Sequence, residues 1–166
     1  MDHPIILFLL TGIASTKGFV IACFMLLTCL VTLKQYRNAM LFCIMLIGLM
    51  VSTTVLKELF QIPRPLNGLI TVSGYAFPSG HASGAMFLGL SICFLSKNLP
   101  PRIKLGVWFF VIALILIIGI SRIAYKVHTP TQVLAGFVVG AFWAWLFMYV
   151  SNITNPLTNT QEKKKE

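Results

Sequence analysis

Long apolar runs alternate with short polar segments along most of the chain. A membrane helix needs about 20 apolar residues, with a range of roughly 17 to 25. Five runs approach or reach that length: Gly18–Leu33, Ala39–Leu56, Ala82–Leu95, Ile103–Ile120 and Val133–Val150. The third run is short, so we expect its helix to begin at the turn that precedes it. The pattern predicts an all-α fold, a polytopic transmembrane helix bundle of five to six spans.

The beginning and the end of the chain differ from this pattern. Ile5–Ser15 is apolar but too short to span alone, which is typical of an interfacial helix, a re-entrant piece or a truncated sixth span. Lys17 separates it from the first clear run. We therefore divide the chain into an N-terminal interfacial or partial membrane helix (1–17), a transmembrane domain (18–150) and a polar, basic tail (151–166).

The composition agrees with a membrane protein and disfavours a nucleic-acid partner. Of 166 residues, 57% are hydrophobic and 10% are charged, and the mean hydropathy is +0.87. Soluble domains carry about 25% charged residues. The net charge of +9 is spread over loops and the tail rather than gathered on a soluble face, so it does not indicate nucleic-acid binding.

Positive charge is distributed unequally between the two sides of the predicted bundle. One side carries Lys34, Arg37, Lys97, Arg102, Lys104, Lys163, Lys164 and Lys165. The other side carries Lys17, Lys57, Arg64, Arg122 and Lys126. The positive-inside rule then places the tail in the cytoplasm and the second set toward the periplasm or exterior. We expect an integral protein of a bacterial inner (plasma) membrane.

Three polar motifs lie at the edges of the apolar runs. They are Lys57–Pro65, Pro78–His81 and Ser121–Arg122 with His128. Counting the spans brings all three to the outward face, so we expect one site there with three cations and two imidazoles. This arrangement points to chemistry on the phosphate of a lipid, because Arg and Lys stabilise the charge on phosphoryl oxygens. Pro63 and Pro65 should hold Arg64 on a stiff, non-helical segment.

The Pro78–His81 motif has two interpretations. Ser79 fits the N-cap of the third helix, and a helix N-terminus is a ready anion site. Gly80 would let the backbone approach a phosphate, with His81 pointing into the site. The alternative is a capped helix with a surface histidine. Together with His128, His81 gives one imidazole to attack phosphorus and one to protonate the leaving oxygen.

These residues resemble the signature of the type 2 phosphatidic acid phosphatase (PAP2) superfamily of membrane lipid phosphatases, K-x6-RP, PSGH and SR-x5-H-x3-D. The resemblance covers about residues 39 to 150 and implies six spans and no metal or other cofactor. It implies that His128 is the nucleophile of a phosphohistidine intermediate and that His81 is the general acid. It implies a set of phosphate-binding residues: Lys57, Arg64, Ser79, Gly80 and Arg122.

One position departs from the signature. The family's Asp, four residues after the nucleophile, is Gln132 here. An amide carbonyl still accepts a hydrogen bond from the histidine, but it supplies no negative charge. In a serine-protease triad, the corresponding Asp-to-Asn change costs about 10⁴ in turnover. The resemblance thus implies a catalytic group of His128, His81 and Gln132.

Other polar positions and the cysteines give weaker indications. Lys126 is a candidate for substrate contact or an interfacial anchor. Tyr75 is a second candidate for substrate contact, and it lies in a stretch, Leu66–Phe77, that forms either a lid or a plain surface loop. The four cysteines lie inside apolar runs without a CxxC pair, so we interpret them as packing residues and expect no metal site.

The sequence favours an enzyme over two other classes. The leading hypothesis is a membrane phosphatase whose partners are the bilayer and a lipid phosphate or diphosphate, of the undecaprenyl diphosphate, phosphatidylglycerophosphate, phosphatidate or lipid A class. The second is a catalytically impaired protein that binds or transports a lipid phosphate, which Gln132 supports and the two histidines oppose. A structural membrane protein leaves the three cations without a role.

Overall fold

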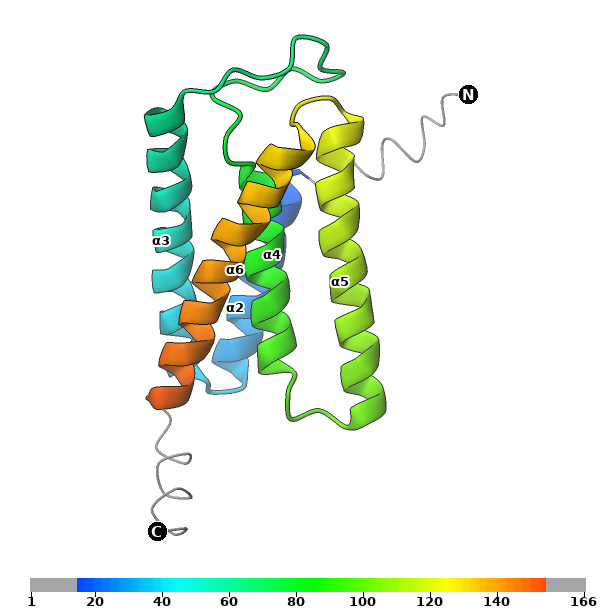
Figure 1. Ribbon diagram of the computed structural model, residues 1–166. Helices are drawn as coiled ribbons and strands as arrows, with labels where there is room; N and C mark the ends of the chain where they lie inside the picture. Colours follow the sequence, from blue (N-terminus) through cyan, green and yellow to red (C-terminus); the bar gives the residue numbers. More distant parts are fainter. Residues whose placement is uncertain (1–14, 155–166) are drawn as a thin grey trace, which may run out of the picture.

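The computed structural model describes residues 15–154, which form a bundle of α-helices running alternately up and down (Figure 1). The helices are α2 (Thr16–Thr32), α3 (Tyr36–Phe60), α4 (Gly80–Leu95), α5 (Pro101–Ala124) and α6 (Pro130–Ile153). Each corresponds to one of the five predicted runs, within one residue at the end of α2, which confirms the predicted fold class. The short segment before residue 15 and the three tail lysines lie outside the described residues.

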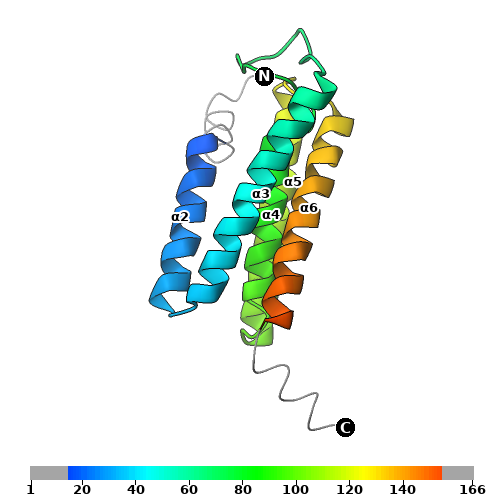
Figure 2. The same cartoon turned by 90° about the vertical axis from the view of Figure 1, so that its left-hand side faces the viewer.

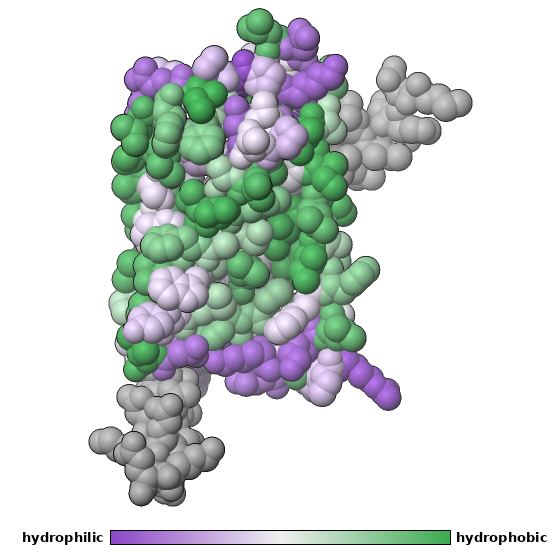
Figure 3. Space-filling model, in the orientation of Figure 1, coloured by the Kyte–Doolittle hydropathy of each residue, from purple (hydrophilic) through white to green (hydrophobic). Residues whose placement is uncertain are grey.

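Three of these helices, α3, α5 and α6, are long and apolar enough to cross a membrane, and α2 and α4 are shorter apolar helices. On the face shown in Figure 3, a mainly apolar belt lies between two polar ends. This belt is where a bilayer would surround the bundle. Helix α2 begins at Thr16, capped by the Ser15 side chain, so Lys17 lies in its first turn rather than before it.

Helix α4 is the centre of the bundle and contacts each of the other four described helices. With 16 residues it is about 24 Å long, whereas the 25 residues of α3 reach about 38 Å. As a result, α4 begins below the upper ends of α3 and α5 (Figure 1). Its first turn, which carries His81, is therefore recessed into the bundle.

The packing of α4 against α6 depends on two glycines one turn apart, Gly136 and Gly140. A Cβ at Gly136 would lie 2.5 Å from the Ser79 carbonyl oxygen, and one at Gly140 would collide with the Ser83 carbonyl oxygen. Small residues at such spacing let two helix backbones approach closely within a membrane. The N-terminal ends of α4 and α6 are thereby fixed side by side.

A hydrophobic core fills the half of the bundle away from the motifs. Phe42 stacks on Phe87 with ring centroids 5.1 Å apart, and Phe147 packs edge-on against Phe42 at 6.1 Å. All three rings are fully buried. Helix α2 stands at the edge of the bundle beside α3 (Figure 2). The buried positions nearer the motifs include polar and charged residues, among them Ser79, Arg122 and His128.

Candidate active site

Residues 61–79 form a long loop that extends over the motif end of the bundle (Figure 1). Its backbone N–H groups donate to main-chain carbonyls at several points: Leu69 to Tyr125, Ala76 to Ile62 and Ser79 to Gln132. Below it lies a pocket of about 290 Å³. Six residues predicted from sequence line this pocket: Lys57, Arg64, Gly80, His81, Arg122 and His128.

The spacing between Arg122 and His128 has a direct structural reason. Helix α5 ends at Ala124, and the Arg122 carbonyl then accepts hydrogen bonds from the backbone N–H groups of Val127, at 3.2 Å, and His128, at 3.3 Å. This closes a tight turn that brings the imidazole back beside the last turn of α5. The Arg122 side chain is 4% exposed and its Nε donates to the Ser121 hydroxyl at 3.2 Å.

The two other cations are held by main-chain carbonyls of the loop. Arg64 follows the left-handed C-cap Gln61 and lies outside the helix, as its flanking prolines predict. Its Nε donates to the Gly74 carbonyl at 3.0 Å. The Lys57 ammonium donates to the Tyr75 carbonyl at 2.7 Å. Neutral carbonyls orient these cations without cancelling their charge, so both remain available to an anion.

The neighbours of His128 define its tautomer. Arg64 Nη1 lies 3.2 Å from His128 Nε2, and an arginine can only donate, so Nε2 is the accepting nitrogen. The proton of the neutral ring is then on Nδ1, which donates to Gln132 Oε1 at 3.2 Å. The lone pair of Nε2 therefore points toward the cationic pocket, as a nucleophile for phosphorus requires.

Gln132 has a second role that the sequence analysis missed. Its Oε1 also accepts from the Thr129 backbone N–H at 3.0 Å, while the Thr129 hydroxyl accepts from the Gln132 N–H at 3.4 Å. This is a capping box at the start of α6, with Pro130 at the first helical position. The Thr-x-x-Gln pattern at the start of the last apolar run was the sequence signal for it. One amide thus caps the helix and orients the imidazole.

The environment of His128 favours its neutral form. Burial and, next, the Arg64 cation lower the pKa of His128 to about 4. The Lys57 cation acts in the same direction, and the hydrogen bonds to Gln132 and to the Ala76 backbone act against it. At neutral pH the ring is therefore an uncharged base, and its Nε2 lone pair faces the Arg64 N–H. A bound phosphate would add negative charge beside it and shift the pKa back upward.

Ser79 occupies the predicted N-cap position of α4 but makes no capping hydrogen bond through its side chain. The residue is fully buried, and its Oγ has no hydrogen-bond partner. A buried hydroxyl without a partner is costly, and Ser79 itself is not among the residues that line the pocket. At the adjacent Gly80, a Cβ would meet nothing within 4 Å. The open space beside the backbone here belongs to the pocket.

Helix α2 contributes to the pocket although none of the motifs lies on it. Thr16 and Phe19 line the pocket, and the Thr16 hydroxyl lies 3.5 Å from His81 Nε2. Met50, Val72 and Val127 complete the lining. Sequence reasoning missed these residues, because a threonine or valine in a connecting segment and an apolar residue within a run carry no distinguishing signal.

The two candidate substrate contacts lie elsewhere. The Lys126 side chain is exposed, its backbone is left-handed, and it does not line the pocket. Tyr75 contributes its carbonyl, which holds Lys57, and its side chain is not part of the lining. Within residues 15–154, no group of three His, Cys, Asp or Glu side chains is placed to hold a metal ion.

A comparison with known protein families shows which family has this sequence and architecture. A sequence model of the PAP2 superfamily matches residues 38–155. The chain belongs to the PAP2 superfamily. The match covers helices α3 to α6 and all three motifs, and it leaves out α2. Together with its apolar helices, membership identifies the chain as an integral membrane protein.

Two curated relatives carry phosphatase names. Phosphatidylglycerophosphatase B of Bacillus subtilis (strain 168) is 34% identical over 113 residues, 66% of this chain and 54% of that protein. Lipid A 4'-phosphatase of Bacteroides thetaiotaomicron is 27% identical over 79 residues, 48% of this chain and 32% of that protein. The chain thus spans about half or less of the length of each relative.

A solved structure shares the fold. The crystal structure described as the first transmembrane PAP2 type phosphatidylglycerolphosphate phosphatase from Bacillus subtilis superposes with a TM-score of 0.83 and 24% sequence identity. The alignment covers 94% of this chain and 81% of that one. It therefore extends beyond the region that the superfamily model matches and includes α2.

Proposed function

We propose that this protein is a metal-independent membrane phosphatase that removes the terminal phosphate of a lipid phosphate or diphosphate. The observation that carries the proposal is one pocket lined by three cations and two imidazoles, with no carboxylate among its described lining residues. The unpartnered Ser79 hydroxyl beside it supports a phosphate ligand. The names of the relatives suggest phosphatidylglycerophosphate or lipid A, and undecaprenyl diphosphate and phosphatidate have the same chemistry.

The reaction proceeds in two displacements at phosphorus. Lys57, Arg64 and Arg122 bind the phosphoryl oxygens, and Nε2 of His128 gives its lone pair to phosphorus. The bond from phosphorus to the lipid oxygen breaks, and that oxygen takes a proton from His81. A water deprotonated by His81 then attacks phosphorus, which breaks the P–N bond, restores the Nε2 lone pair and releases inorganic phosphate.

The active site faces the periplasm or exterior in this proposal. The cations of the α2–α3 and α4–α5 turns, among them Lys34 and Lys97, lie at the opposite end of the bundle. By the positive-inside rule that end faces the cytoplasm of the bacterial inner membrane. The substrate phosphate is then presented by the outer leaflet.

Trapping the intermediate tests the mechanism. Purified protein in nanodiscs receives lipid phosphates labelled with ³²P, and both released phosphate and protein-bound label are measured. We expect His128→Ala to lose both signals, and His81→Ala to lose turnover while the labelled protein still forms slowly. Full phosphate release by a folded His128→Ala variant would overturn the assignment of the nucleophile.

A second function, binding or transport of a lipid phosphate without turnover, is favoured by the neutral Gln132 behind His128. It predicts saturable binding of each lipid phosphate but no release of phosphate from any of them. Release at a rate that depends on His128 would exclude it.

A further inference from the structure

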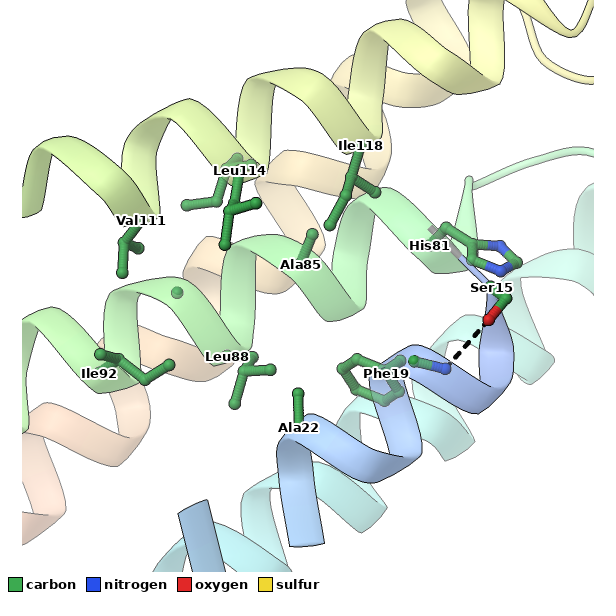
Figure 4. A pocket seen from close by; sticks show the side chains of 13 residues that line it. Ser15, Phe19, Ala22, His81, Ala85, Leu88, Ile92, Val111, Leu114 and Ile118 are labelled. Atoms are coloured by element: carbon green, nitrogen blue, oxygen red, sulfur yellow. Dashed lines mark hydrogen bonds between the residues drawn. The ribbon is translucent and has the colours of Figure 1, made fainter. Parts of the chain in front are cut away.

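A second cavity begins where the phosphate pocket ends. It is a groove of about 390 Å³ between α2, α4 and α5, and its lining is apolar except at Ser15 and His81. Side chains from all three helices point into it, including Phe19, Ala22, Ala85, Leu88, Ile92 and Ile118 (Figure 4).

The groove exists because α2 and α5 both contact α4 but do not contact each other. The face of α4 between them is thus left uncovered by the described helices. Small residues keep it open, since Ala22, Ala85 and Gly89 present little side chain to it. Gly84 of α4 leaves room for the Phe19 ring of α2, because a Cβ there would lie 2.9 Å from that ring.

Two residues join the groove to the phosphate pocket. His81 and Phe19 line both cavities, and His81 lies at the mouth of the groove (Figure 4). In the proposed reaction His81 must touch the oxygen that leaves with the lipid. The hydrocarbon part of the substrate is attached to that same oxygen, so it must depart from the pocket at His81.

The length of the groove matches one leaflet. From His81 to Ile92 the lining follows α4 for eleven residues, about 16 Å at the rise of an α-helix. Half of a hydrocarbon core of about 30 Å is about 15 Å. A hydrocarbon chain that enters at His81 and lies along α4 therefore reaches the middle of the bilayer. It reaches the same depth when the lipid lies in its own leaflet.

We propose that this groove binds one hydrocarbon chain of the lipid phosphate and that α2 makes the protein selective for long-chain substrates. The proposal rests on the proposed function, because the position of the chain follows from the role of His81. Ala22 and Phe19 of α2 are the residues that determine this selectivity, and both lie outside the region matched by the superfamily model.

Filling the groove separates chain binding from chemistry. Ala22→Phe should lower kcat/KM about tenfold for a long-chain lipid phosphate in nanodiscs, through KM, and leave a short-chain, water-soluble phosphate ester unchanged. Ala113→Phe is the matched control, because Ala113 lies on α5 but does not line the groove, and it should change neither substrate. An equal loss for both substrates, or none for either, would overturn the proposal.

A labelling experiment tests the groove without turnover or substitution. A long-chain lipid phosphate with a photoreactive diazirine in mid-chain is irradiated with wild-type protein in nanodiscs, and labelled peptides are mapped. We expect label on α2, α4 and α5, displaced by unlabelled lipid phosphate but not by diacylglycerol. Label confined to α3 and α6, or equal displacement by diacylglycerol, contradicts the proposal. Correct labelling without phosphate release would instead contradict the proposed phosphatase activity.

Discussion

The two ends of the bundle both carry several cations, yet they differ in what surrounds them. At the end away from the motifs, a pocket of about 440 Å³ is lined by Lys34, Arg37 and Lys97. Arg37 donates to the carbonyls of Ser151 and Thr154 at the end of α6. Cations there complement the partial negative charge of a helix C-terminus, and no imidazole lines the pocket.

At the motif end the cations are turned inward and share a pocket with two imidazoles. Arg122 is almost fully buried, and Arg64 contacts the ring of His128. The comparison teaches that the number of positive charges does not distinguish a phosphate site from a topology signal. Burial of the cations and a histidine, the proposed nucleophile, in the same pocket make the difference, and each can be tested by a substitution.

Among the substitutions that test this difference between the two ends, Arg122→Lys should have the largest effect on activity. It keeps the charge but loses the planar fork that binds two oxygens, so we expect kcat/KM to fall about 10²- to 10³-fold. Arg37→Lys at the other end is the matched control, with a change of about twofold at most. Rates of phosphate release at fixed lipid concentration provide the measurement. A comparable loss in both variants would mean that the two ends do not differ in function.

Gly140→Ala should come next, because the added Cβ collides with the Ser83 carbonyl and separates α6 from α4. A displacement of about 1 Å at a catalytic group can cost 10²-fold in rate, so we expect a loss of that order with a lower thermal midpoint. Gly106→Ala is the control, since a Cβ there meets nothing within 4 Å. If Gly140→Ala keeps full activity, close helix packing does not position the histidines.

Ser79→Ala separates activity from stability. Removing one hydrogen bond to a charged phosphate should lower kcat/KM about 10- to 100-fold. The free protein loses only a buried hydroxyl that has no partner, so its thermal midpoint should stay the same or rise. A marked drop in the midpoint would show that the hydroxyl serves the fold instead of the ligand.

Gln132→Glu should have the smallest effect on activity. It keeps the shape of the capping box and adds one negative charge beside His128 Nδ1. The carboxylate should stabilise the cationic ring and raise turnover roughly tenfold, the equivalent of one pKa unit. Gln132→Asp is shorter by one methylene and should gain less. Lower turnover in the Glu variant, with α6 intact, would show that the site requires an amide.

The pH dependence of His128 sharpens the same comparison. Because its pKa is lowered to about 4, the ring stays neutral down to that pH in the free protein. The acid limb of kcat/KM set by this residue should therefore lie near pH 4, and Gln132→Glu should move it upward. Histidine titration by NMR measures the pKa of His128 in the wild-type protein and in the Gln132→Glu variant. An unshifted wild-type value near 6.5 would contradict the buried, cationic environment.

Much of the fold and the grouping of the motifs was predictable from the sequence. Apolar runs report helices directly, and alternation of up and down spans brings Lys57, His81 and His128 to one end. The details were less accessible. The tautomer of His128 depends on where Arg64 lies after a loop, and the Ser79 hydroxyl was expected to cap a helix that it does not cap. Thr16 and Phe19 reach the site through packing alone.

The glycine contact between α4 and α6 has a consequence for the response to the membrane itself. Helices adjust to bilayers of different thickness by tilting, at modest cost. Since α4 and α6 touch backbone to backbone, they tilt as one body, and the separation of His81 from His128 does not change. Lys57 stands on α3, where Gly48 meets the Trp143 side chain of α6 and not its backbone. Membrane thickness would thus alter how tightly the lipid is held, while the bond-breaking step keeps its geometry.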